Sequence, residues 1–239
     1  MFAVLIHIYY PDSWEMIFRE QLCALRDYSP ILLVNLCNTN TNNEEVAAAI
    51  RQDFPAAVVI ITPNKGKDIG GKLALIDLFL KMQLQSDYII LLHDKVSPHA
   101  LRGDVWRSTL FRIIQRENID KILGLFQREP KTGLIGVKEF IKTEYDEKTG
   151  EFTTSNAPQL KELLKEFDLH PRYYSFIGGT MYWVRTSIMV DFFSRHAPLY
   201  YRGALEPGNI MDNEKGSYAH AWERVLCWIA AQDYNLKGI

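Results

Sequence analysis

One loop in the sequence combines basic side chains with glycines at the point where an apolar run gives way to a helical pattern. The stretch PNKGKDIGG contains Asn64, Lys65, Gly66, Lys67 and Asp68. Glycines allow a tight backbone, lysines contact phosphate, and the N-terminal end of the following helix is positive. This chemistry suits a diphosphate, although the spacing fits neither a Walker loop nor GxGxxG. A solvated turn in which Asp68 caps the helix is the alternative.

A second polar group ends the apolar run YIILLHDKVSPH, which contains His93, Asp94, Lys95 and Ser97. A carboxylate at the carboxyl end of a strand can bind a divalent ion or a sugar hydroxyl, and a neighbouring lysine can neutralise a phosphate without metal. The alternative is a surface ion pair of Asp94 and Lys95 beside a buried histidine. Ligands of parallel sheets bind at the carboxyl ends of strands, where this run and the glycine loop both fall.

The last helical pattern, SYAHAWERVL, places His220 and Glu223 three residues apart and therefore on one face. A histidine beside a carboxylate suits general base catalysis or ion binding. Upstream, Asp212 belongs to PGNIMDNEKG, a loop that could fold over a ligand. The alternative is that Glu223 and Arg224 only make surface contacts.

Two glycines interrupt the aromatic strand SFIGGTMYWVR. Gly178 and Gly179 are expected where a ligand or another backbone approaches closely. Aromatic faces suit sugar C–H surfaces and nucleobases alike, so Tyr182 and Trp183 are candidates for binding a sugar, such as an acceptor, or a base, and Trp106 is a weaker candidate. A bulge packed in the core is the alternative.

Alternating strand-like and helix-like segments must position these residues. Residues 1–98 follow a βαβαβ pattern, continued by a helix from about Asp68 to Gln83 and a nearly apolar strand. We therefore predict an α/β fold with a mostly parallel central sheet and helices on both faces. After residue 98 we expect helices near 104–115 and 119–126, a strand at TGLIGV, an exposed or mobile segment KTEYDEKTGEFTTSNAPQ, a helix at QLKELLKEFDL, a helix at TSIMVDFFSRH and a loop APLYYRGALEPGNIMDNEKG.

Composition bounds the function. The 239 residues are 47% hydrophobic, which suits one domain, 1–239, and the change of pattern after residue 98 divides it into halves at 1–98 and 99–239, the second of which ends in a helix. The net charge of -2 argues against non-specific nucleic-acid binding. Three cysteines without a CxxC pattern favour a reducing, cytoplasmic compartment. The apolar start meets Pro11 and Asp12 too early for a signal peptide or a membrane span.

Taken in order, these segments resemble the rhamnan synthesis protein F family, glycosyltransferase-like proteins of bacterial surface polysaccharide and lipopolysaccharide O-antigen biosynthesis. The matching pieces are HIYYPD, PNKGKDIGG, YIILLHDKVSPH, the Trp-Arg pair at Trp106, GLIG, FIGGTMYWVR and MDNEKGSYAHAWERVL. They run from His7 to Leu226. The resemblance implies a GT-A-like nucleotide-sugar fold and transfer of a sugar, often rhamnose or a related one such as galactofuranose, onto a growing glycan. It also implies that residues 1–98 form the nucleotide-binding half and residues 99–239 the acceptor-side half.

The resemblance also implies roles for individual residues. The donor nucleotide is expected at residues 64–68, at the run from His93 to Ser97 and at Gly178 and Gly179. Many GT-A enzymes carry an Asp-x-Asp metal motif where this chain has Asp94 as its single carboxylate. A divalent metal, Mg²⁺ or Mn²⁺, on Asp94 and compensation by lysine therefore remain alternatives. Inverting GT-A enzymes usually place their base in the region of the C-terminal element.

We therefore expect a glycosyltransferase of the hexosyltransferase class that inverts the anomeric centre. Its partners would be a dTDP- or UDP-sugar donor and a lipid-linked or oligosaccharide acceptor, and Glu223 or Asp212 would be the base. A lipid-linked acceptor would place the protein at the inner face of the cytoplasmic membrane, peripherally or in a multi-enzyme association. The alternatives are a non-catalytic nucleotide-sugar or glycan-binding module and a metal-dependent hydrolase built from His93, Asp94, His220 and Glu223.

Overall fold

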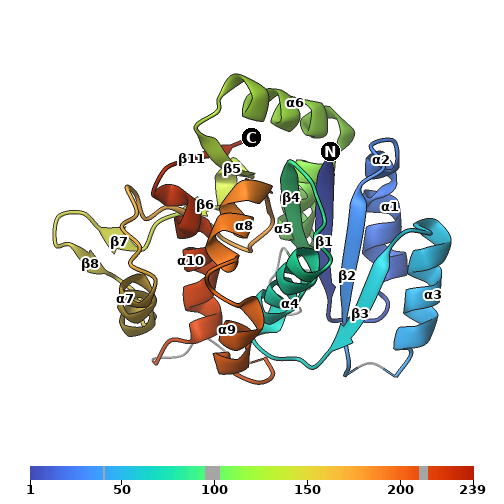
Figure 1. Ribbon diagram of the computed structural model, residues 1–239, viewed down its shortest axis with the longest axis horizontal. Helices are drawn as coiled ribbons and strands as arrows, with labels where there is room; N and C mark the ends of the chain where they lie inside the picture. Colours follow the sequence, from blue (N-terminus) through green and yellow to red (C-terminus); the bar gives the residue numbers. More distant parts are fainter. Residues whose placement is uncertain (40, 95–102, 210–214) are drawn as a thin grey trace.

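The computed structural model describes residues 1–39, 41–94, 103–209 and 215–239. Within these residues a seven-stranded sheet forms the centre of the molecule, in the order β11-β5-β10-β4-β1-β2-β3 (Figure 1). All of its strands run in one direction except β10, which is antiparallel to both β4 and β5. The strands are β1 (Phe2–Ile8), β2 (Ile31–Cys37), β3 (Val58–Thr62), β4 (Tyr88–His93), β5 (Thr132–Gly136), β10 (Tyr182–Arg185) and β11 (Asn235–Gly238).

Helices cover both faces of this sheet, because its strands are apolar on both sides. The face that we call the α4-side core includes Leu5, Leu73, Leu91 and Trp222. Its helices are α4 (Lys67–Lys81), α7 (Ala157–Glu166), α8 (Thr186–Phe193) and α10 (Tyr218–Ala231).

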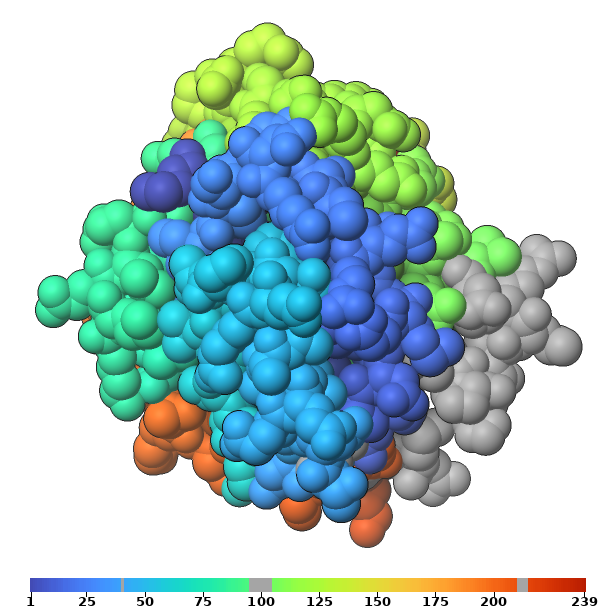
Figure 2. All heavy atoms as spheres, turned by 90° about the vertical axis from the view of Figure 1, so that its right-hand side faces the viewer, coloured from blue at the N-terminus to red at the C-terminus, as the bar shows by residue number. Residues whose placement is uncertain are grey.

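The opposite face, which we call the α5-side core, includes Val4, Ile6, Phe111 and Trp183. Its helical segments are η1 (Trp14–Phe18), α2 (Cys23–Arg26), α3 (Asn43–Asp53), α5 (Gly103–Phe111), η2 (Arg112–Ile114) and α6 (Arg116–Arg128). In Figure 2 the blue residues of the N-terminal third form the surface around the β3 end of the sheet.

The predicted α/β class with a mostly parallel sheet is confirmed. The helix expected from Asp68 to Gln83 is α4, with bounds at Lys67 and Lys81. The aromatic segment expected as one strand is two, β9 (Phe176–Ile177) and β10, because Gly179 and Thr180 adopt φ values of 85° and 49° and bend the chain between them.

Three further segments differ from expectation. The polar excursion after β6 (Ile141–Lys142) contains a hairpin of β7 (Tyr145–Asp146) and β8 (Glu151–Phe152). The expected loop before α10 contains α9 (Pro198–Ala204), which begins with a proline suited to the first helical turn. The short strand β11 was not predicted, because its four residues lack an apolar pattern and join the sheet through backbone pairing with β5.

The remaining helical segments are α1 (Arg19–Gln21) and η3 (Lys138–Phe140). With η1 and α2, α1 forms a series of short helical pieces between β1 and β2, where the βαβαβ pattern predicts a helix. In the described part of the chain, no helix combines the length and the apolar character needed to cross a membrane.

Candidate active site

A row of polar side chains crosses the carboxyl ends of three adjacent strands. His7 on β1 is paired in register with Asn35 on β2 and with His93 on β4. Each lies two residues after a leucine of the α4-side core, so all three side chains face α4. Asn35 Nδ2 lies 2.9 Å from His7 Nδ1. Burial lowers the pKa of His7 to about 4, which keeps its ring neutral.

Helix α4 places an ion pair above this row. Asp68 and Lys72 are one turn apart, with 2.7 Å between Asp68 Oδ2 and Lys72 Nζ. The same ammonium lies 3.1 Å from His93 Nδ1. Burial alone would raise the pKa of Asp68, but the positive charge of Lys72 and its hydrogen bond outweigh this effect and hold that pKa well below its ordinary value. Asp68 is therefore an ionised anchor and too weak a base to accept an acceptor proton.

Close packing explains the glycines at the start of α4. A Cβ on Gly70 would lie 1.7 Å from the carbonyl oxygen of Lys65, and one on Gly71 would lie 2.2 Å from His7 Nδ1. Gly66 adopts the left-handed conformation with φ 71°, and Lys67 follows with φ 54°. The glycines thus let the loop fold back on α4 and let α4 lie directly on the polar row.

The segment before α10 holds this glycine loop in place. Gly66 donates its backbone N–H to the carbonyl of Glu206 at 2.7 Å, and Gly208 donates to the carbonyl of Asn64 at 3.0 Å. The Glu206 carboxylate in turn accepts hydrogen bonds from the first two backbone N–H groups of α10, at 2.5 Å and 3.1 Å. One residue therefore links the beginnings of α4 and α10.

The bend between β9 and β10 reaches the same edge because β10 runs against its neighbours. Its first residues lie where β4 ends, with Tyr182 opposite Leu91. Thr180 Oγ1 donates to Asp68 Oδ2 at 3.0 Å, and the Gly179 N–H donates to Glu223 Oε1 at 2.6 Å. A β-branched residue at positive φ is uncommon, so the structure holds Thr180 in a strained conformation at this site.

The carboxylate of Glu223 is fixed from two directions. Besides Gly179, it is bound by the guanidinium of Arg224, with 2.6 Å between Arg224 Nη1 and Glu223 Oε2. Arg224 is itself buried and donates two hydrogen bonds to Glu144, at 3.0 Å and 2.5 Å. The planar fork of arginine suits this arrangement between two carboxylates.

His220 lies one turn before Glu223 on α10. Its Nδ1 is 2.6 Å from Ser217 Oγ, and Ser217 also caps the helix by accepting from the His220 backbone N–H at 3.2 Å.

These parts enclose a cavity of about 110 Å³ at the carboxyl edge of the sheet. The glycine loop, the end of β4, the bend before β10 and the face of α10 each contribute to its wall. Its lining residues are Lys67, Asp68, Ile69, His93, Gly179, Thr180, Ala219, His220 and Glu223.

Six of the residues singled out from sequence line this cavity: Lys67, Asp68, His93, Gly179, His220 and Glu223. Others lie beside it, since Asn64, Lys65 and Gly66 form the loop that leads into α4 and Gly178 precedes the bend. Three candidates, Lys95, Ser97 and Asp212, lie outside the described residues.

Asp94 turns away from the cavity and anchors the chain after β1. Its carboxylate accepts hydrogen bonds from the backbone N–H groups of Tyr9 and Tyr10 and from Ser13 Oγ, at distances from 2.7 Å to 3.0 Å. Burial raises the pKa of Asp94 to about 6, against these donors, which lower it. Asp94 was expected to bind the donor or a metal. In the structure its carboxylate instead holds the chain after β1 in place.

The aromatic candidates are also placed differently from expectation. Tyr182 and Trp183 have no exposed surface, and Trp183 Nε1 donates to the carbonyl of Ile113 at 2.9 Å. They pack into opposite cores of the sheet, so the expectation that they bind an acceptor is corrected. Trp106 stacks on Phe140, with 5.7 Å between ring centroids, and does not line the cavity.

Sequence reasoning missed Lys72 and Thr180. Lys72 was hidden in the apolar pattern GGKLALIDL, where a lysine among leucines is expected to reach solvent. Its spacing of four from Asp68 was the available signal for an ion pair on α4. Thr180 carried no comparable signal, since its role depends on the bend.

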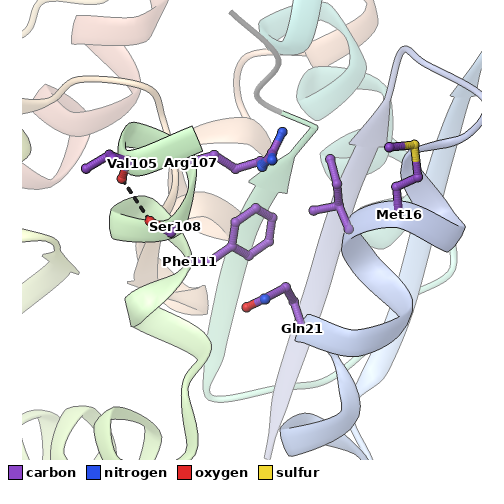
Figure 3. Close-up of a pocket in the computed structure, with 7 residues that line it drawn as sticks. Met16, Gln21, Val105, Arg107, Ser108 and Phe111 are labelled. Carbon is purple, nitrogen blue, oxygen red and sulfur yellow. Dashed lines mark hydrogen bonds between the residues drawn. The ribbon is translucent and has the colours of Figure 1, made fainter. Parts of the chain in front are cut away.

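A larger groove of about 380 Å³ lies on the α5 side of the sheet (Figure 3). Side chains from η1 and α5 line it, including Met16, Arg107 and Phe111 (Figure 3). Among the described residues that line this groove, none is acidic and none is a histidine. The cavity at the sheet edge is therefore the better candidate for acid–base chemistry.

The described residues do not provide a complete set of ligands for a metal ion. Among them, no three or more His, Cys, Asp or Glu side chains are grouped so that they could hold a metal ion. The oxygens of Asp94 are engaged with the chain after β1.

Comparison with solved structures finds remote similarity. One similar structure is that of Staphylococcus aureus TarS, residues 1–349, in complex with UDP. Its TM-score is 0.44 and its sequence identity is 10%, and the match covers 84% of this chain and 53% of that chain. Another is the mannosyltransferase PcManGT from Pyrobaculum calidifontis with GDP-Man and Mn²⁺, with TM-score 0.46, 9% identity and coverage of 99% and 54%. This chain thus spans about half the length of each.

A search of curated proteins finds no match. The family described as Rhamnan synthesis protein F matches residues 1–235, nearly the whole chain. This match includes the glycine loop, the end of β4, the bend before β10 and helix α10, and it shows that the chain belongs to the rhamnan synthesis protein F family.

Proposed function

We propose that the protein is a glycosyltransferase with a GT-A-like fold that moves a hexose from a nucleoside-diphosphate donor to a growing bacterial surface polysaccharide. Rhamnose or a related sugar is the proposed cargo, with galactofuranose as the alternative. The observation that carries the proposal is the placement of Glu223 in one cavity with Lys67 and the N-terminal end of α4. A base and an anion site are the two elements that such a transfer needs.

The donor diphosphate is proposed to lie against the beginning of α4. Lys67 lines the cavity at the first position of the helix, whose N-terminal end favours anions. Further polar atoms without a hydrogen-bond partner among the described residues lie along the same sheet edge: Asn35 Oδ1, Thr62 Oγ1 and Asn64 Oδ1. Buried polar atoms normally have partners, so these suit a polar ligand such as a nucleoside. Pockets for such ligands measure roughly 300–1,000 Å³, so the nucleotide would extend beyond the described cavity wall.

Glu223 is the proposed base. Its orientation is fixed by Gly179 and Arg224, and a carboxylate still has lone pairs for an acceptor hydroxyl beside these two bonds. As Glu223 takes the hydroxyl proton, the acceptor oxygen forms a bond to the anomeric carbon. The bond from that carbon to the diphosphate breaks on the opposite side, with inversion, and its electron pair leaves with the diphosphate. His220, one turn away, is proposed to position the acceptor, and Asp212 is the alternative base.

The acceptor is proposed to be a lipid-linked or oligosaccharide glycan, reached from the cytoplasm at the inner face of the membrane. The family to which the chain belongs supports a polysaccharide acceptor. A lipid-linked acceptor would require peripheral attachment or a partner enzyme.

The first test is the thermal midpoint of the protein with UDP, dTDP, GDP and CDP and their sugars, in Mg²⁺, Mn²⁺ or EDTA. A ligand that binds the folded state raises the midpoint by mass action, so no acceptor is needed. We expect one nucleoside diphosphate and its sugar to raise it. No shift with any nucleotide contradicts a donor site.

The second test is transfer from that donor by Glu223→Gln. We expect kcat to fall by about 10²–10⁴-fold, as for loss of a general base, while the donor-induced midpoint shift is retained. Glu147→Gln, at an exposed position of the β7–β8 hairpin, is the matched control and should keep full activity. If Glu223→Gln and Asp212→Asn both transfer sugar at the wild-type rate, the proposed base is wrong. Donor binding without transfer favours the alternative of a non-catalytic nucleotide-sugar or glycan-binding module.

A further inference from the structure

Lys72 is a charged residue that the proposed mechanism leaves without a role. Its side chain is fully buried within α4, although lysine is rarely buried unless it is paired. It does not line the cavity, whereas Asp68 and His93, which its ammonium contacts, do. Burying a charge is costly, and the ammonium of Lys72 can influence the cavity through its contacts with Asp68 and His93.

The chemistry of the ammonium determines the hydrogen bonding of His93. An ammonium has three protons and no lone pair, so it only donates. The contact of 3.1 Å between Lys72 Nζ and His93 Nδ1 therefore requires Nδ1 to be the acceptor, which leaves the ring proton on Nε2. The carboxylate of Asp68 does not compete for an Nδ1 proton, because its Oδ2 lies 3.6 Å from Nδ1, beyond a normal hydrogen bond.

Asp68 keeps Lys72 in its charged form. The two side chains are 2.7 Å apart, and the low pKa of Asp68 keeps its carboxylate ionised beside the ammonium. Thr180 Oγ1 donates to the same carboxylate oxygen at 3.0 Å, which fixes its position from the other wall of the cavity. The pair is therefore held rigidly behind the ring of His93.

We propose that Lys72 is a positioning residue that holds His93 as its neutral Nε2–H tautomer, so that the ring donates a hydrogen bond to the diphosphate leaving group in the cavity. The inference rests on the proposed function for the identity of that ligand. His93 transfers no proton in this role. The electron pair of the breaking bond stays on the diphosphate, and the Nε2–H and Lys67 stabilise the charge that develops there.

The first experiment measures the tautomer directly in the wild-type chain. The protein is labelled with ¹⁵N-histidine, and long-range ¹H–¹⁵N correlation spectra distinguish the two ring nitrogens. The signal of His93 is assigned by its absence from His93→Gln. We expect a proton on Nε2 and a bare Nδ1 at neutral pH. A proton on Nδ1 overturns the inference, and this measurement requires neither a donor nor activity.

The second experiment replaces Lys72 with methionine, which keeps the length of the side chain and removes its charge. We expect His93 to lose its single tautomer and kcat to fall by about 10²-fold, as for loss of a preorganised donor. The KM for the donor should stay within about threefold, because the hydrogen bond strengthens only as the diphosphate leaves.

Lys81→Met is the matched control on the same helix. Lys81 pairs with Asp77 at 2.9 Å with the same spacing of four, but its side chain is 68% exposed. It should retain the wild-type tautomer, kcat and KM. Equal kcat for the Lys72→Met and Lys81→Met proteins overturns the role proposed for Lys72.

Circular dichroism and the thermal midpoint establish whether Lys72→Met is folded. If this variant unfolds, the wild-type tautomer alone decides the inference. Failure of the donor to bind contradicts the proposed function, and the tautomer of His93 is measured independently of it.

Discussion

At the scale of single residues, the glycine loop owes its composition to contacts with backbone and ring atoms. Gly70 lies against the carbonyl of Lys65, and Gly71 lies against the ring of His7. The nearest atoms to Gly70 are backbone, which has no rotamer through which it could move away. Gly70 and Gly71 are therefore required because a larger side chain would not fit, and not because of the conformational freedom of glycine.

Gly70→Ala should therefore lower the free energy of unfolding by about 1–3 kcal/mol or more, through overpacking. Gly203→Ala is the matched change, because Gly203 lies in α9 with nothing within 4 Å of a new Cβ. It should raise stability by about 0.5 kcal/mol, since alanine is the better helix former. Urea denaturation of both variants checks this prediction. Equal effects of the two substitutions would show that the loop can relax around a methyl group.

At the scale of elements, the polar excursion between β6 and α7 is tied to the candidate base. Glu144 precedes its hairpin and binds Arg224, which in turn holds Glu223. The side chains of Glu144 and Arg224 are 20% and 8% exposed, so this pair is only weakly screened by water.

Glu144→Gln should destabilise the protein by about 1–3 kcal/mol, because a buried guanidinium loses a charged acceptor. It should also lower kcat, since Arg224 then holds Glu223 less firmly. Glu151→Gln removes an ion pair with Lys161 in the same excursion, but both of those side chains are more than half exposed. That control should change stability by less than about 1 kcal/mol and leave kcat unchanged. Thermal unfolding and transfer kinetics distinguish the two variants. Equal stability and equal kcat for Glu144→Gln and Glu151→Gln would contradict the proposed link between Glu144 and Glu223.

The elements were more predictable from sequence than their ends and partners. The strands of the first half are apolar runs bounded by polar turns, and α4 begins within one residue of its predicted start. The convergence of the glycine loop with β4 followed from the rule that parallel strands end at one edge. Glu223 reaches the cavity through its contact with Gly179, and that contact depends on β10 being antiparallel to its neighbours. A local sequence pattern does not reveal the direction of a strand. The burial of Trp183 likewise depends on its central strand, so its aromatic character alone suggested the wrong role.

At the scale of the whole molecule, the candidate site contributes to how stability depends on pH. His7 is 3% exposed, and burial lowers its pKa from 6.5 to about 4. Between these values the unfolded chain binds a proton at this residue and the folded protein does not. The contribution is therefore fully present above pH 6.5 and is lost as the pH falls through 4.

The expected loss is at most about 3.5 kcal/mol, from a shift of about 2.5 pKa units at about 1.4 kcal/mol each. His7→Gln should remove this part of the acid sensitivity, because glutamine does not titrate. Denaturant unfolding at pH 7 and pH 4.5 checks it: the wild type should lose more stability than the variant between the two pH values. Parallel losses would place the acid sensitivity elsewhere, in the carboxylates.

The central sheet runs through both predicted halves of the chain, because β5, β10 and β11 extend the sheet begun by β1 to β4. The division at residue 98 stays a prediction. What the sheet does separate is its two faces: the helices that form the cavity wall, α4 and α10, both pack in the α4-side core. Selection can therefore act on the faces independently. Relatives with other donors or acceptors are expected to diverge by changes along α4 and α10, while compensating gains in stability accumulate among η1, α3 and α6 without disturbing the chemistry.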